Sequence, residues 1–507
     1  MCGFLFLQQE NYNITEREFS ASFNKIKWRG PDKSNITILN GGKTFLGHHR
    51  LEIIQPGHMA DQPMVFGNGR FFLLFNGEIY NHLELRKQLD LQCKSNSDTE
   101  TLAKAYLKLG DALFSKIDGM FSIVIFDQLT CSWTASRDAF GIKPLFIYSG
   151  SKGVALGSEA SAIASMLGNS IDEDSLVEWE IFRRPIPGYS YYTNISEVIP
   201  GSIIKSNGAI TSHWKWEPLD EEFSLPQCET LLNDAIKAHS ISDFKAVSLL
   251  SGGIDSALIS QLSDVSTCYS VGLASNNEFH GAKKTAREIK KHLITKELKE
   301  HELIDLWKML TKLRGEPISL PNEGLIYAVC CAMEKDEKVV LSGEGADELF
   351  FGYDKIFRWA SREKNINLHE TIQMYSYSHR QPTERAMHYL HDLSTGKKPI
   401  DFIEDMFYQL HLPGLLRRVD FSSMAASKEV RVPFVSKDFI SYVYRLPKEI
   451  KISSQESKIP LRRIAEKTGL KSSLSRKKIG FSASLKREEN SQEHYRNFRE
   501  VVLGSIA

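Results

Sequence analysis

The first two hundred residues carry short apolar or alternating runs that are typical of β-strands. Aromatic residues dominate these runs, and Gly, Asn and Asp bound them. The predicted strands are "GFLFL" (3–7), "ITILN" (36–40), "KTFLGHHRLEII" (43–54), "RFFLLFNGEIY" (70–80) and "MFSIVIFD" (120–127). Segments 17–26, 82–90 and 98–110 have helical patterns, the last with Asp98 or Thr99 near its start. We therefore expect antiparallel sheets with helices outside, an α+β sandwich.

The pattern changes at residues 212–226, where polar and Pro-containing residues interrupt the strands and indicate a linker. Beyond it, short apolar runs precede Gly-rich turns and helical segments, which predicts a parallel α/β domain. These runs and segments are 246–250 with 255–262, 267–273 with 282–293, and 338–353. Residues 357–480 are mostly helical in pattern. We expect two domains, 1–215 and 216–507.

Composition narrows the class of protein. A chain of 507 residues is too long for a single hydrophobic core, so we expect more than one domain. Its 63 basic and 63 acidic side chains balance, which argues against a nucleic-acid or membrane-surface role. Seven cysteines without a CxxC pair disfavour a disulfide framework or structural zinc and fit a reducing cytosol. No apolar stretch of about 18 residues and no basic leader occur, so we predict neither a transmembrane helix nor a signal peptide. A cytoplasmic location is the expectation.

A glycine-rich turn, Ser-Gly-Gly-Ile-Asp-Ser at 251–256, separates a predicted strand from a helix. The glycines let main-chain N–H groups converge, and the N-terminus of the helix favours an anion. Asp255 would repel a bare phosphate, so its presence indicates a carboxylate that holds Mg²⁺ there. The string is not a Walker loop. A tight turn with capping Ser and Asp is the alternative, but the complete string favours a nucleotide pyrophosphate site.

A second turn, "SGEGADE" at 342–348, follows another predicted strand. In an open parallel sheet both turns lie at the carboxyl edge, where ligands bind, so Asp255 and Asp347 could share a magnesium ion. The alternative is that Asp347 and Glu348 only complement a helix dipole. We favour function for Glu344 and Asp347, and less strongly for Glu348.

The chain begins Met-Cys-Gly, and removal of Met1 would place Cys2 at the exposed terminus. Its own α-amine can then accept the thiol proton, because the amine titrates near ~7.7–8.0 and the thiol near ~8.5. The alternative is a small buried hydrophobe.

Four other residues favour a nucleophile that acts on a zwitterionic amino acid. Arg50 can bind a carboxylate, Asp98 an ammonium, and Asn76 with Gly77 can form an oxyanion hole. Singly, these residues could be a surface ion pair, an N-cap and a hairpin turn.

Ordered motifs make nearly the whole chain resemble the glutamine-dependent asparagine synthetase family. They are Cys2-Gly3, "RGPD" (29–32), "HHRL", "FNGEIYN", "SDTE", "DGMFSIVIFD", "RDAFGIKPLF", "SGGIDS", "SGEGADELFFGY", "EVRVPF" (429–434) and "SRKKIGF" (475–481). The resemblance implies a glutaminase domain with an N-terminal nucleophile, an α/β/β/α sandwich, at 1–215. An ATP-pyrophosphatase-type synthetase domain with a parallel sheet and a largely helical C-terminal part follows at 216–507.

The resemblance also implies roles for particular residues. Cys2 attacks the glutamine amide and releases ammonia, and Asp255 and Asp347 carry Mg²⁺. Glu344 matches the acid needed around an acyl-adenylate step, and Lys458 matches a lysine that neutralises phosphate charge; without the family, Lys458 is a solvated helix lysine. The glutamine-binding residues are Arg50, Leu51, Glu52, Ile53, Ile54, Asn76, Gly77, Glu78 and Asp98. The ATP-binding residues are Leu250, Ser251, Gly252, Gly253, Asp255, Ser256, Val271, Ser342 and Gly343.

The implied reaction converts a carboxylate to an acyl-adenylate with ATP and then to an amide with ammonia. A sealed passage between the domains would keep ammonia from water, and Arg29 lies in a motif that the family uses near that interface. A homodimer is expected by analogy alone.

The acceptor region, "GEPISLPNEGLIYAV" (315–329), departs from the Asp- and Ser-containing stretch of asparagine synthetases. It is closer to relatives that amidate sugar carboxylates for surface polysaccharides. The first hypothesis is therefore asparagine synthesis from aspartate, and the second is amidation of another carboxylate such as a uronic-acid sugar. Intramolecular β-lactam formation is disfavoured because the Cys2 site is intact. A non-catalytic regulatory or storage protein is disfavoured because Cys2, Asp255 and Asp347 are all present.

Overall fold

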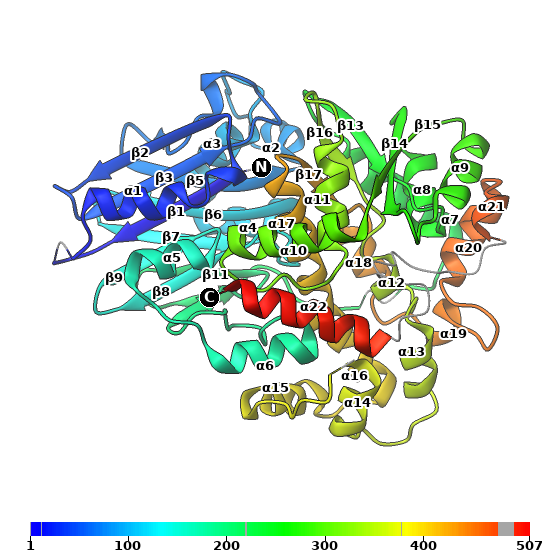
Figure 1. The fold of residues 1–507 in the computed structure, drawn as a ribbon. Coiled ribbons are helices and arrows are strands. Elements are labelled where there is room, and N and C mark those ends of the chain that lie inside the picture. The colour runs from blue at the N-terminus through cyan, green and yellow to red at the C-terminus, as the bar shows by residue number, and fades with distance from the viewer. Residues whose placement is uncertain (1, 12, 219–220, 377, 475–490, 507) are drawn as a thin grey trace.

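The computed structural model describes residues 2–11, 13–218, 221–376, 378–474 and 491–506, without the side chains of residues 491 and 492. Two antiparallel sheets face each other in its N-terminal part (Figure 1). The first sheet has the order β10 (Ile195–Glu197), β8 (Phe146–Gly150), β9 (Gly153–Gly157), β1 (Cys2–Gln8), β3 (Thr44–Arg50) and β2 (Lys33–Leu39). The second has the order β12 (Ile210–Ser212), β11 (Ser202–Lys205), β7 (Ser132–Arg137), β6 (Gly119–Asp127), β5 (Phe71–Ile79) and β4 (Met64–Phe66).

Helices cover the outer faces of both sheets. The first sheet packs against α1 (Glu16–Asn24) and α5 (Ala160–Leu167), and the second against α2 (His82–Gln88), α3 (Asp98–Leu109) and α4 (Leu113–Lys116). Short 3₁₀ turns are η1 (Lys27–Arg29), η2 (His58–Ala60) and η3 (Gly110–Ala112). Period-two alternation turns Phe4 and Phe6 of β1 toward Phe72 and Leu74 of β5 between the sheets. The predicted α/β/β/α sandwich is confirmed.

The second part of the chain contains a five-stranded parallel sheet, as predicted. Its order is β15 (His292–Leu298), β14 (Thr267–Leu273), β13 (Lys245–Leu249), β16 (Glu337–Leu341) and β17 (Glu429–Arg431). The helices of the sheet region are α7 (Leu225–His239), α8 (Ile254–Leu262), α9 (Phe279–Glu288), α10 (Glu300–Arg314), α11 (Glu323–Cys331) and α12 (Ala346–Leu349). The linker prediction holds for the described part of 213–224, which is irregular up to the start of α7.

The predicted helical C-terminal part is confirmed over its described residues. It comprises α13 (Asp354–Ala360), α14 (Leu368–Tyr375), α15 (Glu384–Ser394), α16 (Pro399–Met406), the π-helical turn η4 (Phe407–His411), α17 (Leu412–Ala425), α18 (Lys437–Val443), α19 (Lys448–Lys451), α20 (Ile459–Lys467), α21 (Lys471–Leu474) and α22 (Ser491–Ile506). Helix α6 (Glu173–Phe182) of the N-terminal part packs its Ile181 and Phe182 into this helical region. The "SRKKIGF" motif lies outside the described residues.

Three local predictions were wrong. The strand predicted at 43–54 ends at Arg50, because Leu51 and Ile53 leave the sheet and pack with Val339 and Met424 of the second domain. The helix predicted at 282–293 ends at Glu288, and β15 begins at His292 after Lys290, whose φ is +56°. Strand β17, only three residues long, was missed within a helical region.

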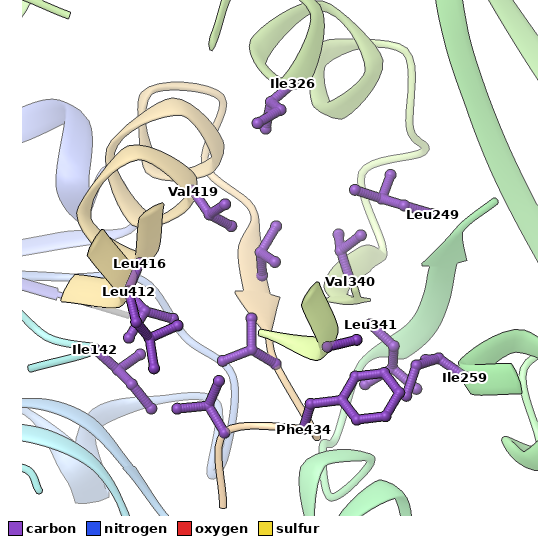
Figure 2. Packing of buried hydrophobic residues seen from close by; sticks show 14 of the residues in the cluster. Ile142, Leu249, Ile259, Ile326, Val340, Leu341, Leu412, Leu416, Val419 and Phe434 are labelled. Carbon is purple, nitrogen blue, oxygen red and sulfur yellow. The ribbon is translucent and has the colours of Figure 1, made fainter. Parts of the chain in front are cut away.

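The two parts meet through an apolar and a charged interface. Figure 1 shows the N-terminus beside β17 and β16 of the parallel sheet. One buried cluster crosses the boundary, and Figure 2 shows its Ile142, from the first domain, against Leu412 and Leu416 of α17. Among the described residues no helix has both the length and the apolarity needed to cross a membrane. All seven cysteines are free thiols.

Candidate active sites

Cys2 lies at the end of the space between the two sheets. Register places it opposite Arg50 of β3, and its main-chain N–H donates to Asn76 Oδ1 at 3.0 Å. The side chain is only 7% exposed, which corrects the expectation of an exposed terminal cysteine. Burial raises the pKa of the Cys2 thiol, while a main-chain hydrogen bond of Leu51 and the charge of Arg50 act in the opposite direction. The thiol therefore needs a nearby proton acceptor to react at neutral pH.

Asn76 and Gly77 lie inside β5, paired with Ser122 and Phe121 of β6, so the hairpin-turn alternative is wrong. Asn76 shares the inner face of β5 with Leu74, and its Nδ2 lies 3.5 Å from Ser122 Oγ. Gly77 has φ +155°, and a Cβ there would lie 2.0 Å from the carbonyl oxygen of Met120. Close strand packing therefore requires glycine beside the nucleophile.

Glu78 and Asp98 make the pocket beside Cys2 acidic. Asp98 Oδ2 accepts from Ile79 N at 3.1 Å and Oδ1 accepts from Thr99 N at 2.7 Å. Ser97, not Asp98, is the N-cap of α3, so the capping alternative for Asp98 is wrong. Burial raises the pKa of Asp98 to about 6. Burial and the neighbouring Asp98 also raise the pKa of Glu78. Both carboxyls are therefore poised to ionise fully when a cation enters.

Arg50 does not point freely into this pocket. Its guanidinium donates to the carbonyls of Ile54 and Gln55 at 3.2 and 2.6 Å and to that of Gly57, and it pairs with Asp61 at 3.0 Å. It is a buried arginine that holds its own loop, rather than the surface ion pair of the alternative prediction. The same loop touches the second domain, where Asp243 N donates to Ile53 O at 3.1 Å and Lys338 Nζ to Glu52 O at 3.1 Å.

The turn at 251–256 has the conformation of an anion cradle. Gly252 has φ +83°, which favours glycine, and Ser256 Oγ accepts from Ser251 N at 3.1 Å. Helix α8 starts at Ile254, within this string, and Leu250 N donates to Tyr269 O of β14 at 2.8 Å. Val271, two residues further along β14, is buried. The string therefore puts the N-terminus of α8 at the end of β13, and such a helix end favours an anion.

The second turn lies against the first. A Cβ at Gly343 would lie 2.9 Å from Ser256 N and 2.9 Å from the carbonyl carbon of Asp255. Ser342 N donates to Arg431 O at 2.9 Å. The structure thus brings the two predicted ATP turns together at the carboxyl edge of the sheet.

Lys458 bridges Asp255 and Asp347, the two carboxylates that the sequence analysis predicts to lie together. Its Nζ lies 2.5 Å from Asp255 Oδ2 and 2.7 Å from Asp347 Oδ1. Although burial opposes it, these two charges hold the pKa of the Lys458 ammonium above its ordinary value. Lys458 is buried and precedes α20, with φ +58° and its N–H bonded to Phe350 O at 3.1 Å, so the solvated-lysine alternative is wrong.

The donor set at this edge fits magnesium. Two carboxylates with converging oxygens are the hard ligands that Mg²⁺ uses when substrate phosphates and water complete its shell. In the described residues no group of three or more His, Cys, Asp or Glu side chains is arranged to hold a metal ion. Any magnesium here would thus depend on phosphate for part of its coordination.

Glu344 and Glu348 each have a polar neighbour that sequence reasoning missed. Glu344 Oε1 accepts from Arg418 Nη2 of α17 at 2.8 Å. Glu348 Oε1 accepts from Tyr353 Oη at 2.7 Å, and His411 lies 3.6 Å away. Glu348 is buried, which raises its pKa together with the charge of Asp347, so it does more than complement a helix dipole.

Arg29 links the nucleophile to the second domain. Its Nε donates to Cys2 O at 3.0 Å, and its other nitrogens pair with Glu159 at 2.6 Å and Asp420 at 2.7 Å. Lys143 also pairs with Asp420 at 3.2 Å. Asp420 stands two residues after Arg418 on α17, so one helix contacts both candidate centres.

Arg431 is a further residue that sequence reasoning missed. It is fully buried and pairs with Glu78 across the boundary between the domains at 3.1 Å. The only signal for it was its place in "EVRVPF", because nothing local to that motif indicates a partner more than 350 positions away.

Comparisons with known proteins agree with this two-site arrangement. Residues 227–505 match the family model described as asparagine synthase, and residues 1–216 match that of a glutamine amidotransferase domain. Asparagine synthetase (glutamine-hydrolyzing) 1 of Bacillus subtilis (strain 168) is 27% identical over 96% of this chain and 87% of its own length. Asparagine synthetase (glutamine-hydrolyzing) of Asparagus officinalis is 26% identical over 84% of this chain and 66% of its own length.

A solved glutamine phosphoribosylpyrophosphate amidotransferase from B. subtilis overlaps 58% of this chain and 65% of its own, at 15% identity and a TM-score of 0.32. That similarity is too low to carry a conclusion about function.

Proposed function

Since the chain belongs to the asparagine synthase family and carries a glutamine amidotransferase domain, we propose that it is a glutamine-hydrolysing asparagine synthetase. It converts aspartate, glutamine, ATP and water to asparagine, glutamate, AMP and pyrophosphate. The observation that carries the proposal is the pairing of Asp255 and Asp347 through Lys458, in a chain whose Cys2 site is also complete.

The first half of the reaction takes place between the sheets. After removal of Met1, the α-amine of Cys2 accepts the thiol proton, and the sulfur attacks the amide carbon of glutamine. The backbone N–H of Gly77 and the side-chain amide of Asn76 stabilise the oxyanion of the tetrahedral intermediate. The α-ammonium of Cys2 then gives its proton to the amide nitrogen, the C–N bond breaks, and ammonia leaves as the thioester forms. Water then releases glutamate. Asp98 and Glu78 bind the substrate ammonium, and the loop held by Arg50 closes the pocket.

The second half takes place at the sheet edge. An oxygen of the aspartate side-chain carboxylate attacks the α-phosphorus of ATP, and pyrophosphate leaves. Ammonia then attacks the acyl carbon, and AMP leaves with the electron pair of the broken C–O bond. The N-terminal end of α8, with Gly343 packed against it, would bind the phosphates, and Lys458 would neutralise the charge that develops on them. Magnesium held by Asp255 and Asp347 would supply further charge neutralisation.

Pyrophosphate release in the presence of glutamine and ATP–Mg²⁺, with and without aspartate, tests the proposal. We expect release that depends on aspartate, together with equimolar AMP and asparagine. Pyrophosphate release that does not depend on aspartate but increases with a sugar acid would contradict asparagine synthesis. It would remain consistent with the adenylation chemistry. ADP and phosphate in place of AMP and pyrophosphate would contradict the acyl-adenylate.

A further inference from the structure

Three carboxyl groups crowd the inner end of the candidate glutamine pocket. Glu78, Asp98 and Glu429 are buried. Burial and the charges of Asp98 and Glu429 raise the pKa of Glu78, and burial with the charge of Glu429 raises the pKa of Asp98. Glu78 and Asp98 come from the first domain, whereas Glu429 lies on β17 of the second. Such a cluster is stable in the folded chain only with a cation between its members.

Arg431 is that cation. Its Nη2 lies 3.1 Å from Glu78 Oε2 and its Nε 2.6 Å from Glu429 Oε1. Its Nη1 donates to the carbonyls of His239 at 2.9 Å and Ile241 at 2.5 Å. The guanidinium is therefore fixed by the second domain and reaches across to a carboxyl of the first.

Arg431 pairs with one of the two oxygens of the Glu78 carboxyl group. The second oxygen, Oε1, is buried without a hydrogen-bond partner. Glu78 shares the inner face of β5 with Asn76, which contacts the Cys2 main chain. An ammonium group that enters beside Cys2 thus meets a carboxyl whose position Arg431 sets.

The main chain of Arg431 makes a second contact. Parallel pairing puts Arg431 opposite Leu341, and Arg431 O accepts from Ser342 N at 2.9 Å. Ser342 and Gly343 form the turn that lies against the first turn of α8. One residue therefore binds a glutamine-site carboxyl through its side chain and an ATP-site turn through its backbone.

We propose that Arg431 is a positioning residue of the glutamine pocket, supplied by the synthetase domain, and that it couples glutamine binding to occupation of the ATP turn. This inference rests on the proposed function of both sites. Because binding linkage is reciprocal, ATP should change the affinity for glutamine and glutamine the affinity for ATP by the same factor. The glutaminase site is then incomplete without β17.

Arg431→Lys and Glu78→Gln test the proposal in the full-length enzyme. In a glutaminase assay without acceptor, we expect either change to raise the KM for glutamine about tenfold with a smaller change in kcat, because ground-state binding is lost. We expect ATP–Mg²⁺ to shift the wild-type KM for glutamine about fivefold and to leave that of Arg431→Lys unchanged. Pyrophosphate release with ammonium in place of glutamine should fall less than glutamine-supported release in both variants.

A matched control separates positioning from general stability. Arg137 is also fully buried, pairs with Glu197 at 2.9 Å, and donates to the carbonyls of Lys143, Gly141 and Val198. None of these partners is among the predicted glutamine- or ATP-binding residues. Arg137→Lys should lower thermal stability as Arg431→Lys does without changing the KM for glutamine or its response to ATP.

An unchanged KM for glutamine in folded Arg431→Lys and Glu78→Gln overturns the proposal. Equal losses of glutamine-supported and ammonium-supported rates overturn it too, since they indicate a structural role only. The proposal is also overturned if ATP–Mg²⁺ leaves the wild-type KM for glutamine unchanged. Failure of the proposed function would give a different result. Wild type would then release no pyrophosphate under any condition, while the glutaminase assay would still show the effect of Arg431→Lys on the KM for glutamine.

Discussion

The two candidate centres are assembled in different ways. Around Cys2, strand register places Arg50 beside the nucleophile, and the facing sheet brings Asn76 of β5 to its main-chain N–H. At the ATP edge, the carboxylates of Asp255 and Asp347 stand in the first turns of α8 and α12, and Lys458 reaches them from the start of α20. The first centre is fixed by regular pairing, and the second by charges that meet from separate segments.

The difference reflects where the reactive groups come from. The nucleophile of the first site is part of the chain, so strands can fix it before any substrate arrives. The phosphates of the second site arrive with ATP, so in the absence of ATP its carboxylates need a cation from the protein itself. Lys458 supplies it, and the same ammonium can later face the phosphates.

Cys2→Ala should have the largest effect and would show whether the first centre depends on one atom. Without the sulfur, no acyl-enzyme can form, so glutamine-supported amidation should fall by roughly 10³-fold or more. Ammonium-supported pyrophosphate release should persist, because the second centre is untouched. Cys93→Ala, a partly buried cysteine elsewhere in the first domain, is the control and should behave as wild type. Loss of both activities in Cys2→Ala would contradict two separable sites.

Asp255→Asn should have nearly as large an effect on the second centre. The amide keeps the size of the side chain but removes the charge that pairs with Lys458 and that would hold the proposed magnesium, so pyrophosphate release should fall by about 10²–10³-fold. Hydrolysis of glutamine should remain measurable. Asp264→Asn, an exposed aspartate just beyond α8, is the matched control. An ATP reaction that survives Asp255→Asn would refute the magnesium assignment.

Sequence periodicity could predict the first centre better than the second. The alternation along β1 and β5 reports burial between the sheets, and it places Cys2 on the inner face of one sheet and Asn76 and Glu78 on the facing inner face of the other. It misplaced the end of β3, because Leu51 and Ile53 are apolar for contact with another domain rather than for the sheet.

The second centre depends on partners that no local pattern encodes. Lys458 has an ordinary helical setting in the sequence, and only the fold brings it to Asp255. Strand β17 is three residues long and is bounded by helices, so its periodicity is too short to read. Arg431 and Arg418 were missed for the same reason, since a buried charge is explained by a partner distant in sequence.

Acidification should lower the activity of the first centre by a moderate factor and so distinguish it from the second. Below about pH 6, Asp98 binds a proton and loses the charge that attracts the glutamine ammonium, so kcat/KM for glutamine should fall about tenfold per pH unit there. Glu78, whose pKa is also raised, acts in the same direction, and the Cys2 thiol titrates at higher pH. The measurement is a glutaminase pH profile.

Asp98→Asn should weaken binding and remove this acid step. Asp118→Asn is the control, because burial also raises the pKa of Asp118 but its nearest cation is Lys437, outside the pocket. A step near pH 6 that persists in Asp98→Asn would assign the titration to another group.

Gly343→Ala should have the smallest effect and probes how closely the two ATP turns must approach. Its Cβ would lie 2.9 Å from Ser256 N, so the turns must separate by a few tenths of an ångström. Overpacking of this kind costs about 1–3 kcal/mol, which corresponds to a rise of roughly 5- to 100-fold in the KM for ATP if all of it falls on the bound state. Gly504→Ala, where a Cβ meets open space, should change nothing. The three atoms nearest to that Cβ all belong to Asp255 and Ser256 of α8. We therefore expect the KM for glutamine without ATP to stay constant. A shift in that value as large as the shift for ATP would mean that the second centre is as rigidly joined to the first as two strands of one sheet.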